Sequence, residues 1–162
     1  NEIDEYRLSV LAGYKRSKAE VLARMEQRKQ SKPQHKKQDD SYISLTELAR
    51  NHSKNTPGYV IQSWLRSENT LAFLNLWEQE NNPDYREAGY IELLEKKKTA
   101  SFTLTPKLWI EKTKAIGIAS KQGKGGGTFA HPMIGCEFAS WISPEFKMLL
   151  LNLSLNRERL KE

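Results

Sequence analysis

The chain has 162 residues, of which 38% are hydrophobic, and it contains four tryptophans, so its composition indicates a globular domain with a core. No apolar run approaches the roughly 20 residues of a membrane-spanning helix, and no signal peptide is visible, although the chain starts on Asn1 rather than Met and residues could precede it. A single cysteine, Cys136, leaves no internal disulfide and favours a reducing, cytoplasmic setting.

The formal net charge of +6 is concentrated in one part of the chain. Between Leu94 and Lys124, eight lysines stand against two glutamates. A basic stretch of this kind favours an acidic polymer as partner, most simply nucleic acid. The alternative is an ordinary solvated surface, and charge alone does not separate the two.

Residues 1–40 are predicted to form a part separate from residues 41–162. Apolar residues recur at helical spacing through residues 4–30, and the stretch KQSKPQHKKQDD that follows is polar, basic and contains a proline, as linkers do. We expect an amphipathic helix at residues 4–30. It could pack on the body, pair with a second copy or dock a protein partner.

The body is expected to begin with a short strand at Tyr42 and Ile43 and a helix directly after it. Ser44 and Glu47 form an S-x-x-E capping box, in which the serine side chain satisfies a free N–H at the start of a helix. This helix is predicted at residues 45–51.

A second helix is predicted directly after the turn SKNT, with Thr56 as its cap and Pro57 at its first position. Its apolar residues leave Gln62 and Arg66 on an outer, polar face. A short helix, a tight turn and a second helix with a polar face are typical of a helix-turn-helix, although adjacent short helices also occur in any α-rich core. A third helix is expected at residues 71–80.

The second half of the chain is predicted to contain a β-hairpin. We expect a strand at residues 101–104, then a helix that Thr105 caps, Pro106 opens and Gly117 ends. The runs IGIAS and TFAH then flank KQGKGGG, and two β-prone runs around a glycine-rich connection indicate a hairpin with a basic tip. Two helices follow, the second restarting at residues 143–144.

Four blocks resemble the KilA-N domain of bacterial, phage and large DNA virus proteins: YISLTELAR, VIQSWLRSENTLAFLNLWEQENNP, SFTLTPKLWIEKTKAIGIASKQGKGGGTFAH and EFASWISPEFK. The resemblance covers about residues 41–147, and the family is similar to the APSES domain of fungal transcription factors. It implies an α+β, winged-helix-like DNA-binding fold, with the helix-turn-helix at residues 45–66 and the glycine-rich hairpin as its wing. Residues 87–99 depart from the family pattern.

The predicted contact surface for double-stranded DNA combines the helix-turn-helix with this hairpin. Gln and Arg side chains can pair with base edges, residues near a helix N-terminus favour phosphate, and glycines let backbone approach phosphate closely while lysines release counterions. The predicted DNA-binding residues are Asn55, Thr56, Tyr59, Gln62, Arg66, Lys112, Lys114, Lys121, Gln122, Lys124, Gly125, Gly126, Gly127, Thr128 and His131. A mobile surface loop is the alternative reading of the glycine-rich segment.

Other chemistry is weakly supported by the sequence. A phosphate-binding loop of the G-K-[ST] type needs its lysine after the glycines, whereas GKGGGT has it before them. A structural zinc site needs four ligands at set spacings, whereas of the three histidines and one cysteine His35 lies in the linker and His52 in a turn. Cys136 is expected to be a small buried residue, and the tryptophans are expected in the core. His131 could be a hydrogen-bonded hairpin residue or a phosphate contact at the base of the wing. We predict no catalytic residue, no metal and no cofactor.

Two classes of function remain from the sequence. The first is a DNA-binding regulator of bacterial or phage origin. The second is an antirepressor-like interaction module that binds another protein rather than DNA. The two differ in how DNA affinity depends on salt, because binding to phosphates weakens steeply as salt rises.

Overall fold

The computed structural model describes residues 19, 23 and 41–159. The chain divides into two compact units, Asn1–His35 and Lys36–Glu162, and the fold given below is that of the described part of the second unit. The helix predicted at residues 4–30 falls almost wholly outside the described residues.

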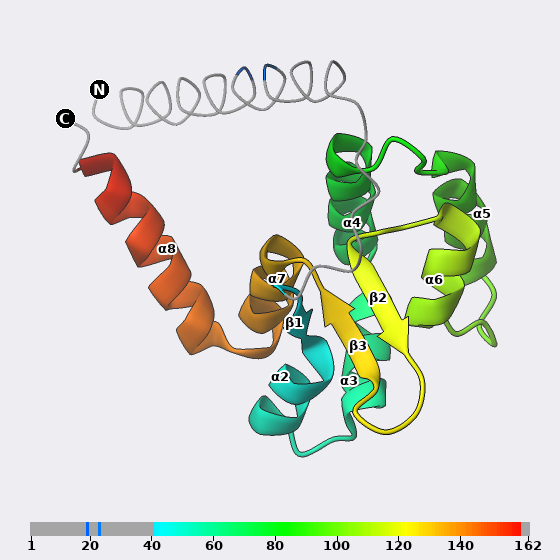
Figure 1. Cartoon of the computed structure of the whole chain (residues 1–162), viewed down its shortest axis with the longest axis horizontal. Helices are drawn as coiled ribbons and strands as arrows, with labels where there is room; N and C mark the ends of the chain where they lie inside the picture. Colours follow the sequence, from blue (N-terminus) through cyan, green and yellow to red (C-terminus); the bar gives the residue numbers. More distant parts are fainter. Residues whose placement is uncertain (1–18, 20–22, 24–40, 160–162) are drawn as a thin grey trace. The chain divides into compact units, whose positions relative to one another are not determined.

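Residues 41–159 form a mixed α+β fold, as predicted, in which helices surround one small antiparallel sheet (Figure 1). In the sheet, β3 lies between β1 and β2, and Ala130 of β3 is opposite both Ile43 and Ile118. The elements are β1 (Ile43–Ser44), α2 (Leu45–His52), α3 (Pro57–Leu65), α4 (Glu68–Asn81), α5 (Glu87–Lys97), α6 (Pro106–Thr113), β2 (Ile118–Lys121), β3 (Gly127–Ala130), α7 (Pro132–Ile142) and α8 (Pro144–Arg159).

Hydroxyl side chains start several of these helices, because they satisfy backbone N–H groups that have no partner within the helix. The Glu47 N–H donates to Ser44 Oγ (3.1 Å) at the start of α2, and the Leu108 N–H donates to Thr105 Oγ1 (3.2 Å) at the start of α6. Both caps were predicted. Thr56 also precedes a helix, but its side chain makes no capping hydrogen bond, so the fixed backbone angle of the following proline is what favours the start of α3.

Three expectations about the helices and strands differ from the structure. The third helix begins at Glu68 rather than at residue 71, because the side chain of Ser67 accepts from the Thr70 N–H (3.4 Å). Helix α5, in the segment that departs from the family pattern, was not predicted. The predicted strand at residues 101–104 does not form: the segment pairs with no other strand, although Leu104 is buried.

The role predicted for Gly117 as a helix terminator is also wrong. Helix α6 ends at Thr113, and Lys114 takes the left-handed conformation with φ 54°. Gly117 is needed for a different reason: a Cβ there would lie 2.5 Å from Cδ1 of Ile134 and 2.7 Å from the ring of Trp77. The missing side chain therefore lets the strand β2 begin directly against the core.

The core lies between the sheet and the helices and is built on large aromatic and aliphatic side chains. Trp64, Trp109 and Phe138 are fully buried, and Trp77 is 4% exposed, in agreement with the prediction. The fourth tryptophan, Trp141, is 44% exposed and stacks on Phe138, so the prediction of a core position is wrong for it. Cys136 is only half-buried, so the prediction of a buried position is wrong for it as well.

One buried carboxylate fastens the base of the hairpin to α4. Glu78 is 1% exposed, and its oxygens accept hydrogen bonds from the Ile116 N–H (3.0 Å), the Gly117 N–H (2.7 Å) and Nδ2 of Asn82 (2.8 Å). Burial raises the pKa of Glu78, and these hydrogen bonds oppose the rise. The same Asn82 nitrogen donates to the Lys114 carbonyl (2.8 Å), so the chain entering β2 is held on both sides.

Candidate nucleic-acid interface

The tip of the β2–β3 hairpin is an ordered turn. Lys121 is opposite Gly127 in the ladder, and the Gly126 N–H donates to the Gly123 carbonyl (2.9 Å) across the connection. Gly123 and Gly125 have φ of 85° and 72°, values that other residues adopt at a cost. The glycines therefore build a specific turn, which argues against the reading as a structureless loop.

The hairpin is fastened to α2 at the point where the tip begins. The Thr128 N–H donates to Thr46 Oγ1 (2.9 Å), and a Cβ on Gly127 would lie 2.6 Å from the same oxygen. Strand β1, which leads directly into α2, pairs with β3 through Ser44 and Phe129. Helix α2 and the hairpin are therefore positioned together.

An open groove of about 570 Å³ separates the hairpin tip from α2. An ion pair of 3.9 Å joins the exposed side chains of Glu47 and Arg50 within it. The groove is lined by Ser44, Thr46, Glu47 and Arg50 on one side and by Gly123, Gly125, Gly126 and Phe129 on the other. The backbone of the hairpin tip and the guanidinium of Arg50 therefore border the same groove.

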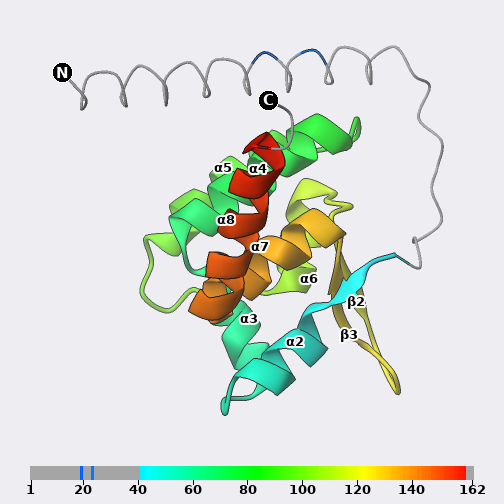
Figure 2. The same ribbon diagram turned by 90° about the vertical axis from the view of Figure 1, so that its left-hand side faces the viewer.

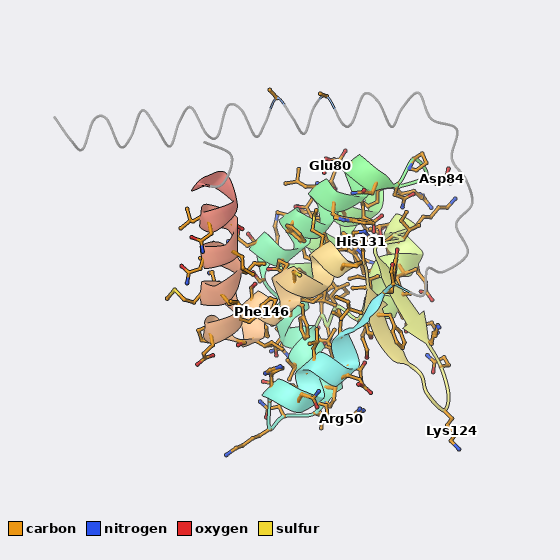
Figure 3. All side chains as sticks on the ribbon, turned by 60° about the vertical axis from the view of Figure 1, so that its left-hand side comes forward. Arg50, Glu80, Asp84, Lys124, His131 and Phe146 are labelled. Atoms are coloured by element: carbon orange, nitrogen blue, oxygen red, sulfur yellow. The ribbon has the colours of Figure 1, made fainter. Side chains whose placement is uncertain are left out.

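The α2–α3 connection and the hairpin tip lie at the same end of the body (Figures 1 and 2). Figure 3 shows Arg50 and Lys124 at this end. We call residues 50–59 and 121–127 the basic end. They include Arg50, Lys54, Lys121 and Lys124, all exposed, and contain no Asp or Glu. The Lys121 ammonium lies over the ring of Phe129, 5.1 Å from its centroid, so a cation–π contact holds this side chain on the hairpin.

The predicted residues of α3 divide between the two ends of that helix. Asn55, Thr56 and Tyr59 are exposed and belong to the basic end, whereas Gln62 is half-buried. Arg66 is exposed just after the C-terminus of α3, and its guanidinium carbon is 5.7 Å from the ring centroid of Tyr59. A row of side chains therefore runs along one side of α3 from the basic end toward its C-terminus.

Two predicted lysines lie away from the hairpin tip. Nζ of Lys112 is 3.0 Å from Oε1 of Glu92, which Lys96 also contacts at 3.1 Å. The hydrogen bonds from Lys112 and then Lys96 lower the pKa of Glu92. Lys114 terminates α6 and precedes β2, so it lies near the base of the hairpin rather than near its tip. The structure therefore does not bring these two residues together with Lys121 and Lys124.

His131 also lies at the base of the hairpin, as Figure 3 shows by its distance from Lys124. Its Nδ1 accepts from the Met133 N–H (3.1 Å) and so caps α7. Its ring centroid is 5.0 Å from that of Trp77 and 6.1 Å from that of Tyr42. The structure therefore shows His131 as a hydrogen-bonded residue at the end of the hairpin, which is one of the two roles that the sequence left open for it.

Sequence reasoning missed the basic side chains of α2 and of the connection after it. Arg50 and His52 occupy the last turn of α2, and Lys54 follows in the turn. All three are exposed at the basic end. The basic stretch counted in the sequence, Leu94 to Lys124, does not include them. The absence of acidic residues from 48 to 67 is the sequence signal that could have identified them.

Among the residues that the structure describes, no group of three or more His, Cys, Asp or Glu is arranged to hold a metal ion. No helix in the described part of the chain is long and apolar enough to span a membrane.

Comparison with known proteins gives a consistent family assignment. The KilA-N domain family matches residues 26–157, so the match begins fifteen residues before the predicted start of the domain at residue 41. A segment of 31 residues is 55% identical to "Protein kilA" of Escherichia phage P1, and it amounts to 19% of this chain and 12% of the phage protein. The match thus covers well under two thirds of the length of that relative. No solved structure matches this chain.

Proposed function

The chain belongs to the KilA-N domain family, and from this premise we propose that it binds double-stranded DNA through its basic end. In this proposal α2 and α3 act as a helix-turn-helix and the β2–β3 hairpin acts as a wing beside it. The observation that carries the proposal is the basic end itself: exposed cations from two separate segments around a turn of glycines, with Glu47, which pairs with Arg50, as the acidic side chain that lines the groove between α2 and the tip.

Each part of the basic end has a distinct role in the proposal. Lys121 and Lys124 of the wing, with Arg50 and Lys54, attract phosphates and release counterions. The backbone at Gly125 and Gly126 has no side chain in the way and can approach the sugar-phosphate surface. Exposed Gln122 lies beside it, whereas Thr128 is 8% exposed and its N–H already donates to Thr46. Asn55 and Thr56 precede the N-terminus of α3, where phosphate binding is favoured.

Base readout is assigned to the exposed row on α3. Tyr59 and Arg66 are exposed and Gln62 is half-buried, and Arg and Gln side chains can form paired hydrogen bonds with guanine and adenine. Lys112, Lys114 and His131, which the sequence also suggested, have structural roles in the proposal because they lie at the base of the hairpin or pair with Glu92. The protein would act as a bacterial or phage-derived regulator in the cytoplasm, without catalysis.

The salt dependence of DNA affinity tests this proposal. Replacing both Lys121 and Lys124 by alanine should weaken binding to every duplex and reduce the slope of log affinity against log salt by about two units, because two phosphate contacts are lost. The matched control is Lys114→Ala with Lys147→Ala, which removes the same charge from exposed sites elsewhere.

Each result decides between the two classes of function. A slope that falls only in the wing variant supports the wing as a phosphate-binding element. Equal slopes in both variants would remove the wing from the interface. No salt-dependent DNA binding by the unmodified chain would favour the antirepressor-like module, which binds a protein instead.

A further inference from the structure

One acidic side chain lines the groove between α2 and the hairpin tip. Residues 41–67 and 112–136 supply β1, α2, α3 and the whole β2–β3 hairpin, and Glu47 is the only Asp or Glu in these two ranges. Its side chain is 69% exposed and makes an ion pair of 3.9 Å with Arg50, one turn along the helix. A carboxylate is thus placed on a surface where every other charged group is a cation.

The start of α2 depends little on the charge of Glu47. The Glu47 N–H donates to Ser44 Oγ (3.1 Å), so the cap uses the backbone of Glu47 and the side chain of Ser44. The carboxylate is in contact with Arg50 instead. A negative charge in the first turn does suit the helix dipole, but glutamine serves at this position of a capping box without any charge.

The contact between Glu47 and Arg50 is loose. Its N···O distance of 3.9 Å is longer than that of a hydrogen bond, and both side chains are more than 60% exposed. Exposed ion pairs of this kind contribute little, because water and salt screen them. The paired hydrogen bonds of a guanidinium with a phosphate are shorter and stronger. A phosphate that enters the groove can therefore take Arg50 away from Glu47.

The opposite wall of the groove leaves room for such a phosphate. It consists of Gly123, Gly125 and Gly126, whose backbone has no side chain in the way, together with Phe129. Lys124 belongs to the same tip, and Figure 3 shows it at the same end of the body as Arg50. A phosphate in the groove would have cations on both sides and one like charge, Glu47, beside it.

We propose that Glu47 limits DNA binding, because it pairs with Arg50 until a DNA phosphate displaces it. The proposal rests on the function proposed above. In the free chain Glu47 neutralises Arg50. In the complex the phosphate pairs with the guanidinium and leaves the carboxylate beside another negative charge, which lowers affinity. Since phosphates are the same in every sequence, Glu47 weakens binding to all duplexes and leaves base readout unchanged.

Glu47→Gln tests this role, because it keeps the shape of the side chain and removes its charge. It should raise affinity for unrelated duplexes by about three- to tenfold at low salt and steepen the slope of log affinity against log salt by about one unit. The ranking of duplexes should stay the same. Thermal unfolding should change little, since the cap at Ser44 is kept.

Glu145→Gln is the matched control. Glu145 is also an exposed acid in the first turn of a helix, and its removal changes the net charge of the chain by the same amount. It lies on α8, away from the groove, so its effect on affinity and on the slope should be much smaller.

Arg50→Gln shows whether Glu47 acts through Arg50. On its own it should lower the slope by about one unit, because one phosphate contact is lost. In the Arg50→Gln background, the gain in affinity from Glu47→Gln should be clearly smaller, since no guanidinium is left to release. A gain of the same size in both backgrounds would contradict the displacement of Glu47 from Arg50.

The outcomes separate this proposal from the proposed function. If the unmodified chain bound DNA with a steep salt slope and Glu47→Gln gave no gain, or no more than Glu145→Gln, the role of Glu47 would be wrong and DNA binding would stand. If neither the unmodified chain nor Glu47→Gln showed salt-dependent binding, both proposals would be overturned.

Discussion

Arg66 lies where α3 ends, with its guanidinium carbon 5.7 Å from the ring centroid of Tyr59. The contact with this ring orients the guanidinium, and a hydrogen bond from the Lys97 ammonium to the Arg66 carbonyl oxygen holds the backbone at the end of α3. A guanidinium held along the side of a helix has lost part of its rotational freedom, so presenting its donors to a base costs less entropy. Position and chemistry thus agree in making Arg66 the strongest candidate for base readout.

We therefore expect Arg66→Ala to relax specificity at one base position, at a cost of about 1–3 kcal/mol on the preferred sequence. Arg66→Lys should keep most of the affinity for unrelated duplexes and lose the discrimination, because an ammonium cannot make the paired hydrogen bonds of a guanidinium. Competition binding against a panel of single-base variants measures both effects.

Arg86→Ala is the control, since Arg86 is an exposed arginine that precedes α5. If Arg66→Ala and Arg86→Ala gave the same ranking of duplexes as the unmodified chain, direct readout by Arg66 would be wrong. A change of ranking in the Arg86 variant alone would move the readout to a different part of the surface.

At the scale of elements, the hairpin and α2 are joined by one close approach. Gly127 has φ 137°, and any Cβ there would lie 2.6 Å from Thr46 Oγ1, the oxygen that accepts from the Thr128 N–H. Only glycine satisfies both the backbone angle and the distance. The orientation of the wing relative to the helix-turn-helix therefore depends on a residue without a side chain.

Gly127→Ala should destabilise the fold by about 1–3 kcal/mol, since it adds strain at this backbone angle and pushes Thr46 away. Amide hydrogen exchange at Thr128 should also become faster, because its hydrogen bond to Thr46 is lost. Gly58→Ala is the matched control: a Cβ there meets nothing within 4 Å, and alanine in a helix should leave stability unchanged or raise it by up to about 1 kcal/mol. Equal effects of the two substitutions would show that the approach to Thr46 is unimportant.

At the scale of the whole molecule, Glu78 connects α4 to the base of the hairpin through three short contacts with the Ile116 and Gly117 N–H groups. Its pKa is raised in the folded chain, above the ordinary value of 4.5, because burial outweighs its hydrogen bonds. A carboxyl that holds its proton more tightly when folded favours folding at low pH. Its contribution therefore decreases as pH rises from about the unfolded pKa through the folded one.

Glu78→Gln should lower the free energy of unfolding by about 1–3 kcal/mol, because an amide nitrogen replaces an oxygen that accepts a hydrogen bond. The difference between the unmodified chain and this variant should shrink as pH rises, since glutamine does not titrate. Urea unfolding at a series of pH values measures it. Glu80→Gln, two residues along α4, should stay within about 0.5 kcal/mol. A difference that grew with pH would mean that the pKa of Glu78 is lowered on folding.

Local signals in the sequence predicted much of the fold. The capping box at Ser44 and the Thr105–Pro106 start gave helix starts correctly, and the glycine-rich connection gave the hairpin. These features depend on residues close together in the chain, so the sequence contains the physics that decides them. The start of α4 was missed because its cap precedes the apolar residues by several positions.

The sequence by itself determined the mixed α+β class, the family, the hairpin and the positive charge of its tip, because each depends on short stretches read in order. The tertiary structure alone decided which basic residues lie together. It set Arg50 across the groove from the hairpin tip and left Lys112 with Glu92, because β1 pairs with β3 and Thr46 bonds Thr128, 82 residues away. Contacts between distant residues follow from packing of the whole chain, which no local pattern records.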